Sequence, residues 1–345
     1  EVPFLPASLN RNKKSITLNL QQEEGVELFM SLVRVSDIVW ENMRPGVMDR
    51  LGVGYEALKE INPGIIFVSL SGFGQGDIRP GPFKDWPAFD AVGQAMSGFM
   101  FASGKEGDPP LLSASAVADT VPSITAAFAA LVALQMRQRT GLGQHVDVSM
   151  YDSMVALNNL AINLYLFADA KMPRGRLITS APFGPFKAKD GYVVIAAGGE
   201  RIWQRFCQAI GREDLVGRPE LRNGHERALN LETILRPIIE DWAADKTRQE
   251  VCNRLLEHEV PAVPAQDVED VVACPHLEAR NAFWEIDDPS LGKVKAVGNP
   301  IKMSAALPSP PASPPLAGEH NQEIYGDLLG LNSQQVDALR GKGVL

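Results

Sequence analysis

The first half of the chain alternates between short apolar runs and stretches with helical spacing. Apolar residues at Val26, Phe29, Met30 and Val33 recur three or four positions apart, which is typical of a helix with one buried face. Between such helices lie β-rich runs, expected as strands: SITLNL (15–20), DIVW (37–40), IIFVSLSGFG (65–74) and HVDVSM (145–150). This alternation predicts βαβ units and a mostly parallel sheet covered on both faces.

The clearest helix is an Ala-rich stretch that begins near Pro122 and ends at Gly141. Pro122 suits its first turn, Arg137 its last turn, and Gly141 its C-terminal cap. Asp119 stands just before this helix, where a capping carboxylate is common. The same position also suits a nucleophile, because a helix N-terminus offers a positive dipole end and free N–H groups for an oxyanion. Both interpretations fit these residues.

The amino-acid composition changes after about residue 171, where the segments MPRGR and SAPFGP are rich in Pro and Gly. A turn and strand, KDGYVVIAAGG, precede several helical stretches, which together indicate a separate α+β domain. The expected organisation is a large α/β domain (1–175 and 300–345), a small α+β domain (180–295) and a Pro-rich linker (308–317).

Charge bears on the class of ligand. The 345 residues carry a net charge of −9, which argues against broad binding to nucleic-acid phosphates. A local basic neighbourhood nevertheless follows DIVW, where Arg44 and Arg50 stand with Asn42, and Lys13 and Lys14 lie near the start. These residues could hold a phosphate-bearing ligand, or they could form a solvated helix face.

The remaining composition favours a cytoplasmic enzyme without a metal. No stretch approaches 18 consecutive apolar residues, so we expect no membrane span. The cysteines are odd in number and lack CxxC spacing, which favours a reducing compartment over a disulfide framework or zinc site. The histidines form no metal-binding pattern. The chain opens at Glu1 without a methionine, so any targeting signal before it would not be seen.

The sequence GFGQG (72–76) follows a strand and suggests a dinucleotide-binding turn. A true fingerprint of this kind opens a helix that faces the pyrophosphate. Here Asp77, Arg79 and Pro80 follow, so no helix can begin promptly, and we expect a loop. Because ligands of open α/β sheets bind at the carboxyl ends of the strands, this loop could still serve a site.

Several segments, in order, resemble the class III CoA-transferases, the formyl-CoA transferase and carnitine CoA-transferase type. The matching segments are SLNRNKKSITLNL, DIVWENMRPGVMDRLGVGYEALKEINPGIIFVSLSGFGQ, FDAVGQAMSG, ASAVAD, RTGLGQHVDVSMYD, KDGYVVIAAG, VPAVPAQDVEDVV and LAGEHNQEIYGDLLG. The resemblance implies a large Rossmann-like α/β domain, a small α+β domain and an interlocked homodimer. It also implies that Asp119 is the catalytic carboxylate.

The family's CoA-binding positions fall on Leu18, Gln21, Asn42, Met43, Arg50, Pro87 and Asp90. Gln21 and Pro87 stand where relatives can carry Lys. Two features of the family have no counterpart in these residues: an initial βα segment with a Gln near the active site, and the long glycine-rich loop of formyl-CoA transferase. The lack of that loop weighs against oxalate or formate as substrate.

The resemblance implies transfer of CoA from an acyl-CoA, with succinyl-CoA as the habitual donor, to a carboxylic acid through a covalent aspartyl intermediate. CoA thioesters are then substrates, and no tightly bound cofactor or metal is implied. The sequence shows no competing Ser/His or Cys/His constellation. One alternative is a 2-methylacyl-CoA racemase, in which a His precedes the Asp equivalent to Asp90; Phe89 fills that place and cannot carry a proton. The other is a non-catalytic CoA-binding subunit.

Overall fold

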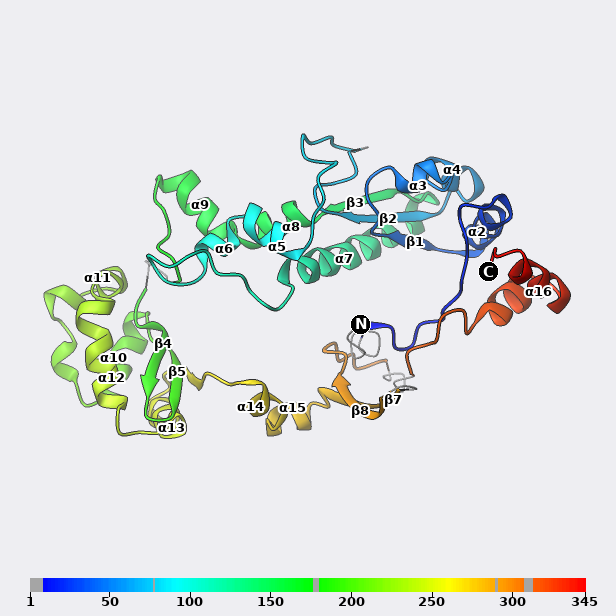
Figure 1. Cartoon of the computed structure of the whole chain (residues 1–345). Coiled ribbons are helices and arrows are strands. Elements are labelled where there is room, and N and C mark those ends of the chain that lie inside the picture. Colours follow the sequence, from blue (N-terminus) through cyan, green and yellow to red (C-terminus); the bar gives the residue numbers. More distant parts are fainter. Residues whose placement is uncertain (1–8, 77, 176–179, 289–290, 307–312) are drawn as a thin grey trace. The chain divides into compact units, whose positions relative to one another are not determined.

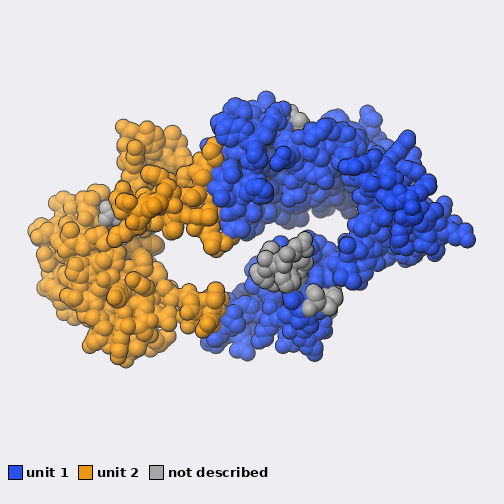
Figure 2. Space-filling view, viewed as in Figure 1, with its two compact units in different colours: residues 1–93, 116–154, 272–345 blue, residues 94–115, 155–271 orange. Residues whose placement is uncertain are grey.

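The computed structural model describes residues 9–76, 78–175, 180–288, 291–306 and 313–345. The chain divides into two compact units, coloured separately in Figure 2. Unit 1 contains residues 1–93, 116–154 and 272–345, and unit 2 contains residues 94–115 and 155–271. The domain boundaries expected from the sequence stay a prediction. Of the expected Pro-rich linker, residues 308–312 lie outside the described residues, and residues 313–316 contain no helix or strand.

Unit 1 is built on a parallel three-stranded sheet in the order β1-β2-β3 (Figure 1). Its strands are β1 (Ile38–Glu41), β2 (Ile66–Ser71) and β3 (His145–Ser149). β2 pairs with both neighbours, so that Ser69 lies beside Glu41 on one side and Asp147 on the other. The carboxyl ends of all three strands therefore meet at one edge. A mixed α/β fold with a parallel sheet is confirmed.

Helices cover both faces of this sheet, because alternate side chains of β2 point to opposite faces. Phe67 packs on one face with Val33 and Leu58. Ile66 and Val68 pack on the other face in a second core. The covering helices are α2 (Glu23–Val35), α3 (Val47–Arg50) and α4 (Tyr55–Ile61) on the first face, and α7 (Val117–Thr140) on the second.

α7 begins earlier than the sequence predicts. The expected start is Pro122, but the helix starts at Val117, so Pro122 lies within its second turn. Its N-cap is Ala116, in the left-handed region with φ of 45°. The added turn is stabilised by a residue outside the helix, because the backbone N–H of Ala118 donates a hydrogen bond to Asp90. The predicted C-terminal cap is confirmed: Gly141 has φ of 76° and closes onto the carbonyl of Arg137.

α7 is also long and apolar enough to cross a membrane by length and composition, and an 18-residue window within it has a mean hydropathy of 1.7. No membrane span is expected from the sequence because no run of 18 residues is entirely apolar. A mean over a window tolerates interspersed polar residues, and for that reason this helix meets the hydropathy criterion. Ala126 and Ala130 of this helix pack on the sheet as part of its core. The opposite face stays open: Ile124, Phe128 and Leu131 are each at least 65% exposed. α7 is therefore a sheet-covering helix with an uncovered apolar stripe.

The expected strand at residues 15–20 is absent from the described structure. This segment bonds to the C-terminal part of the chain instead of to the sheet. Thr17 N donates to Asn321 Oδ1 at 2.9 Å, and Asn19 N donates to the carbonyl of Val344 at 2.8 Å. The partners lie some 300 residues away in the sequence, and no strand ladder forms. The partner segment contains a π-helix (Gln322–Leu328) and α16 (Ser333–Gly341).

Unit 2 contains an antiparallel three-stranded sheet, β4-β5-β6, packed against helices. Its strands are β4 (Phe183–Ala188), β5 (Gly191–Ala196) and β6 (Ala262–Pro264). The helices beside it include α10 (Glu200–Ala209), α11 (Gly224–Leu229), α12 (Arg236–Ala243) and α13 (Arg248–Glu257). Further helices and strands of the chain as a whole are α5 (Asp90–Met96), α6 (Phe99–Ala102), α8 (Met150–Leu157), α9 (Asn159–Ala168), α14 (Val268–Val272), α15 (Pro275–Ala279), β7 (Phe283–Asp288) and β8 (Gly292–Val297). Cys207, Cys252 and Cys274 are free thiols.

Candidate active site

Asp119 is the third residue of α7, and its side chain is exposed. It is not the helix cap, because Ala116 occupies that position. Within the described ranges, no hydrogen bond to the Asp119 carboxylate is found. The capping role is therefore taken elsewhere, and this carboxylate is free to meet another molecule.

The role of capping α7 falls to Asp90, the first residue of α5. Its Oδ1 accepts a hydrogen bond from the amide of Ala118 at 2.7 Å. Gly93 makes this approach possible, since a Cβ there would lie 2.8 Å from both Ala118 Cβ and Met150 Sδ. α5 and the first turn of α7 are thus held in close contact, with Asp90 beside Asp119.

The pKa of Asp119 is raised above its ordinary value. Partial burial is the larger cause, because it disfavours the charged form. The negative charge of Asp90 is the second cause. A more basic carboxylate is a better nucleophile, and shifted pKa values of this kind cluster at functional sites.

The amides of this helix terminus are already committed. Ala118 N donates to Asp90, and Asp119 N and Thr120 N both donate to the carbonyl of Ala116, at 3.1 and 3.0 Å. The sequence-based idea that free N–H groups here would stabilise an oxyanion is therefore wrong for these three donors. Two of them bond to Ala116 in the same turn, and the third bonds to Asp90.

The predicted CoA-binding residues Asn42 and Met43 lie in the loop that follows β1, and Arg50 ends α3. All three are exposed. The loop folds back at Gly46, which has φ of 75°, and a Cβ there would lie 3.2 Å from Nη1 of Arg50. The carboxyl end of β1 thus presents an amide side chain, a thioether and a guanidinium to solvent together.

Leu18, Gln21 and Pro87 stand apart from that group. Gln21 is exposed, and its backbone N–H donates a hydrogen bond to Asn19 Oδ1 at 3.0 Å. In the part of the chain that the structure describes, no hydrogen bond joins Leu18 or Gln21 to the loop after β1. Pro87 is exposed, just before α5, and the next residue lies against the carboxyl end of β2. The structure therefore brings Asp90 and Asp119 together, and separately Asn42, Met43 and Arg50.

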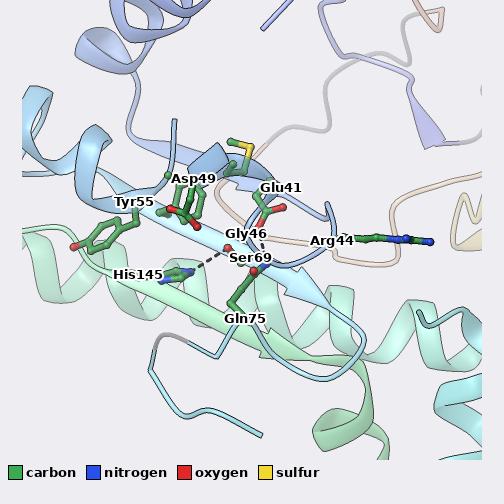
Figure 3. Close-up of a pocket in the computed structure, with 11 residues that line it drawn as sticks. Glu41, Arg44, Gly46, Asp49, Tyr55, Ser69, Gln75 and His145 are labelled. Carbon is green, nitrogen blue, oxygen red and sulfur yellow. Dashed lines mark hydrogen bonds between the residues drawn. The ribbon is translucent and has the colours of Figure 1, made fainter. Parts of the chain in front are cut away.

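The basic residues singled out near the chain start are engaged elsewhere. Lys14 forms an ion pair with Glu323, and Lys13 Nζ donates to Asn10 Oδ1 at 3.1 Å. Arg44 is exposed, and Figure 3 shows its side chain pointing away from the cavity that it borders. Of the basic residues singled out as candidates for a phosphate-bearing ligand, Arg44 and Arg50 therefore remain.

A small cavity lies between the sheet and helices α3 and α4 (Figure 3). It holds a Ser–His pair that sequence reasoning missed, since His145 Nε2 lies 3.0 Å from Ser69 Oγ. Ser69 is fully buried, and the cavity volume is about 10 Å³, room for one water molecule. This Ser/His contact is buried and cannot receive an acyl substrate, so it is not a catalytic constellation that competes with Asp119.

The loop GFGQG does not form a dinucleotide-binding turn. β2 ends at Ser71, and the next helix, α5, begins only at Asp90. Gln75 instead donates its backbone N–H to both carboxylate oxygens of Asp147, at 3.1 and 3.0 Å, and its side chain to Glu41. Sequence reasoning missed Glu41 and Asp147, although each is a charged residue within an apolar strand.

Comparison with known proteins decides the class. Residues 3–321 match the sequence model of the family described as CoA-transferase family III. The chain belongs to CoA-transferase family III. A succinyl-CoA:mesaconate CoA-transferase from Haloarcula hispanica is 36% identical over 338 residues, covering 96% of this chain and 84% of the relative. A formyl-CoA:oxalate CoA-transferase from Streptomyces avermitilis is 33% identical, covering 98% and 85%.

A solved structure supports the same assignment. The CAIB/BAIF family protein from Brucella suis is 31% identical, with a TM-score of 0.79 over 94% of this chain and 83% of that one. The protein is therefore a CoA-transferase that acts on acyl-CoA and carboxylate substrates. Phe89, in the place of the racemase histidine, is 80% exposed, and its phenyl ring carries no exchangeable proton.

Proposed function

We propose that this CoA-transferase moves CoA from succinyl-CoA to a dicarboxylic acid, through a covalent adduct on Asp119. The observation that carries the proposal is the state of that carboxylate. It is exposed, its pKa is raised, and the cap of its helix is provided by Asp90. The substrate class rests on the relatives, whose names contain succinyl-CoA with mesaconate and formyl-CoA with oxalate.

The first half of the reaction loads the enzyme. An Asp119 oxygen attacks the thioester carbonyl of succinyl-CoA, the C–S bond breaks, and a mixed anhydride and CoA thiolate result. The thiolate then attacks the Asp119 acyl carbon of the anhydride. The C–O bond breaks, succinate leaves with the electron pair, and an aspartyl-CoA thioester remains.

The second half reverses these steps with the acceptor. A carboxylate of the acceptor attacks the aspartyl thioester, releasing CoA thiolate and forming a new anhydride. The thiolate attacks the acyl carbon of the acceptor, the C–O bond to Asp119 breaks, and the carboxylate is regenerated. Because water would hydrolyse the anhydride, the loaded site must exclude solvent.

The CoA moiety is held, in this proposal, by residues at the carboxyl edge of the parallel sheet. Arg50 supplies a permanent positive charge for a phosphate, and Asn42 supplies amide hydrogen bonds. Met43, Leu18, Gln21 and Pro87 contact the less polar parts of CoA, and Asp90 flanks the reacting group. Asn42, Met43 and Arg50 are supported by their place after β1, and Pro87 and Asp90 by theirs at the start of α5. Leu18 and Gln21 rest on the family resemblance alone.

We further propose that the protein works as an interlocked homodimer in the cytoplasm, without nucleic-acid or membrane partners. Two uncovered apolar surfaces support self-association. α7 exposes Ile124, Phe128 and Leu131, and α9 has no buried residue while exposing Leu166 and Phe167. Exposed apolar area of this kind usually marks an interaction site, and a second copy would cover both helices.

The function is tested by exchange and by trapping. Purified protein is mixed with succinyl-CoA and single acids from a panel that includes mesaconate, malate, oxalate and acetate, and new thioesters are identified by mass. We expect products with the dicarboxylic acids and little with acetate. Adding hydroxylamine during turnover should convert the thioester to a hydroxamate, which peptide mapping should place at Asp119. Exchange with no modified Asp119 would overturn the covalent mechanism.

A further inference from the structure

A buried carboxylate joins the loops that follow two of the parallel strands. Glu41, the last residue of β1, is only 8% exposed. Its Oε2 accepts a hydrogen bond from the backbone N–H of Met43 at 2.7 Å, and its Oε1 accepts one from Gln75 Nε2 at 3.0 Å. Gln75 is in turn anchored, because its backbone N–H donates to both oxygens of Asp147 on β3.

We propose that Glu41 is a positioning residue for CoA binding, acting through Met43 and Gln75; this inference rests on the proposed CoA site. Burial of a carboxylate is unfavourable unless both of its oxygens are satisfied. Here both oxygens bond to loops and neither bonds to the strand ladder. The conformation of Asn42 and Met43 is thereby fixed before a ligand arrives.

Fixing the loop in advance should lower the entropy cost of binding, so its loss should appear in affinity. For Glu41→Ala we expect KM for acyl-CoA and Kd for CoA to rise by about 10-fold or more, as for a lost hydrogen bond to a charged group. We expect kcat and KM for the acid to change by less than about 3-fold, because Asp119 lies on a different element.

The conservative variant separates hydrogen bonding from charge. In Glu41→Gln the introduced amide oxygen can still accept from Met43, and its NH₂ group can donate to the oxygen of Gln75 once that side chain rotates. This variant should recover affinity to within about 3-fold of the parent. Gln75→Ala keeps the hydrogen bond between Glu41 and Met43 and removes the side-chain hydrogen bond from Gln75 to Glu41. It should therefore give an intermediate Kd for CoA.

The control is a second glutamate, in unit 2, that also accepts one backbone and one side-chain hydrogen bond, both on a single oxygen. Glu240 Oε1 accepts from the backbone N–H of Lys187 at 3.1 Å and from Arg236 Nη1 at 3.0 Å. Glu240→Ala should lower the unfolding temperature and leave Kd for CoA unchanged. If Glu41 had a purely structural role, Glu41→Ala would behave like Glu240→Ala, and KM for acyl-CoA would not rise relative to kcat in either variant.

The experiment is calorimetric titration with CoA, with steady-state kinetics on the same folded variants, alongside Asn42→Ala and Arg50→Ala. If those last two leave Kd unchanged, the proposed CoA site itself fails. If they raise Kd and Glu41→Ala and Gln75→Ala do not, the positioning role is overturned. Equal losses in Glu41→Gln and Glu41→Ala would also overturn it. Should Glu41→Ala fail to fold, Gln75→Ala decides the matter alone.

Discussion

Asp90 accepts the amide hydrogen of Ala118 at 2.7 Å, and this bond places one carboxylate directly beside the next residue, Asp119. A single contact thus caps α7 and sets the electrostatic surroundings of the candidate nucleophile. The negative charge of Asp90 adds to partial burial in raising the pKa of Asp119. The residue that caps the helix and the candidate nucleophile are different, so the Asp119 carboxylate accepts no hydrogen bond from the residues that the structure describes.

This pairing makes the pH dependence of transfer testable through Asp90→Asn. The amide oxygen keeps the bond to Ala118, but the negative charge beside Asp119 is removed, so the pKa of Asp119 should fall. Since the nucleophile must be ionised, activity is lost as pH falls through that pKa. The acidic limb of kcat/KM against pH should therefore move to lower pH. Asp85→Asn, an equal charge change on the preceding loop, should leave the limb in place; an unmoved or raised limb in Asp90→Asn would contradict the assignment.

Contacts that decide the site are distant in sequence, which limits what pattern alone can predict. The alternation of apolar positions was sufficient for β1, β2 and β3, because period and burial are local properties. The cap on Ala118 comes from 28 residues earlier, and Gln75 meets Glu41 across 34 residues. Likewise residues 15–20 read as a strand, yet their partners are C-terminal. The residue types at the candidate site were predictable through family resemblance; the hydrogen bonds between them were not.

The close approach of α5 and α7 predicts a steric effect at Gly93. A methyl group there would lie 2.8 Å from Ala118 Cβ and from Met150 Sδ, so Gly93→Ala must push the two helices apart. We expect a stability loss of about 1–3 kcal/mol, typical of overpacking, together with reduced kcat because Asp90 and Asp119 separate. Thermal unfolding and steady-state rates measure both. Gly81→Ala is the control, since nothing lies within 4 Å of a Cβ there; equal behaviour of the two variants would show that the helix contact is not needed.

Salt dependence should distinguish Arg50 from other exposed arginines. If its guanidinium meets a CoA phosphate, Arg50→Ala should raise Kd for CoA by about 10-fold at low salt. The difference from the parent should shrink as ionic strength rises, because screening weakens the lost interaction. Calorimetry at several salt concentrations gives both values. Arg280→Ala, also an exposed arginine of unit 1, should bind CoA like the parent at every concentration, and the same result for Arg50→Ala would remove Arg50 from the site.

The apolar stripe of α7 leads to an expectation about assembly. The native species should show twice the chain mass of 37.5 kDa by light scattering, even after extensive dilution. Phe128, which is 68% exposed, should be covered in that species, so Phe128→Glu should abolish it and leave aggregated or unfolded chain. Gln138→Glu adds the same charge at an exposed polar position of the same helix and should keep the doubled mass. A folded, doubled species in Phe128→Glu would show that this stripe lies outside the interface.

Asp119 is the proposed nucleophile, and its substitution separates a catalytic role from a structural one. Asp119→Asn keeps the size of the side chain but leaves a poor nucleophile, and Asp119→Ala leaves none. Both should lose transfer by a factor equivalent to about 5 kcal/mol of barrier or more, while Kd for CoA stays near that of the parent. The alternative, a helix-terminal carboxylate that only stabilises α7, predicts a loss of about 1 kcal/mol in unfolding free energy and near-normal rates. Since Ala116 is the N-cap and Asp90 accepts from Ala118, we expect little change in stability from either variant. Full transfer activity in Asp119→Ala, with protein checked by mass to exclude parental contamination, would end the case for this residue as nucleophile.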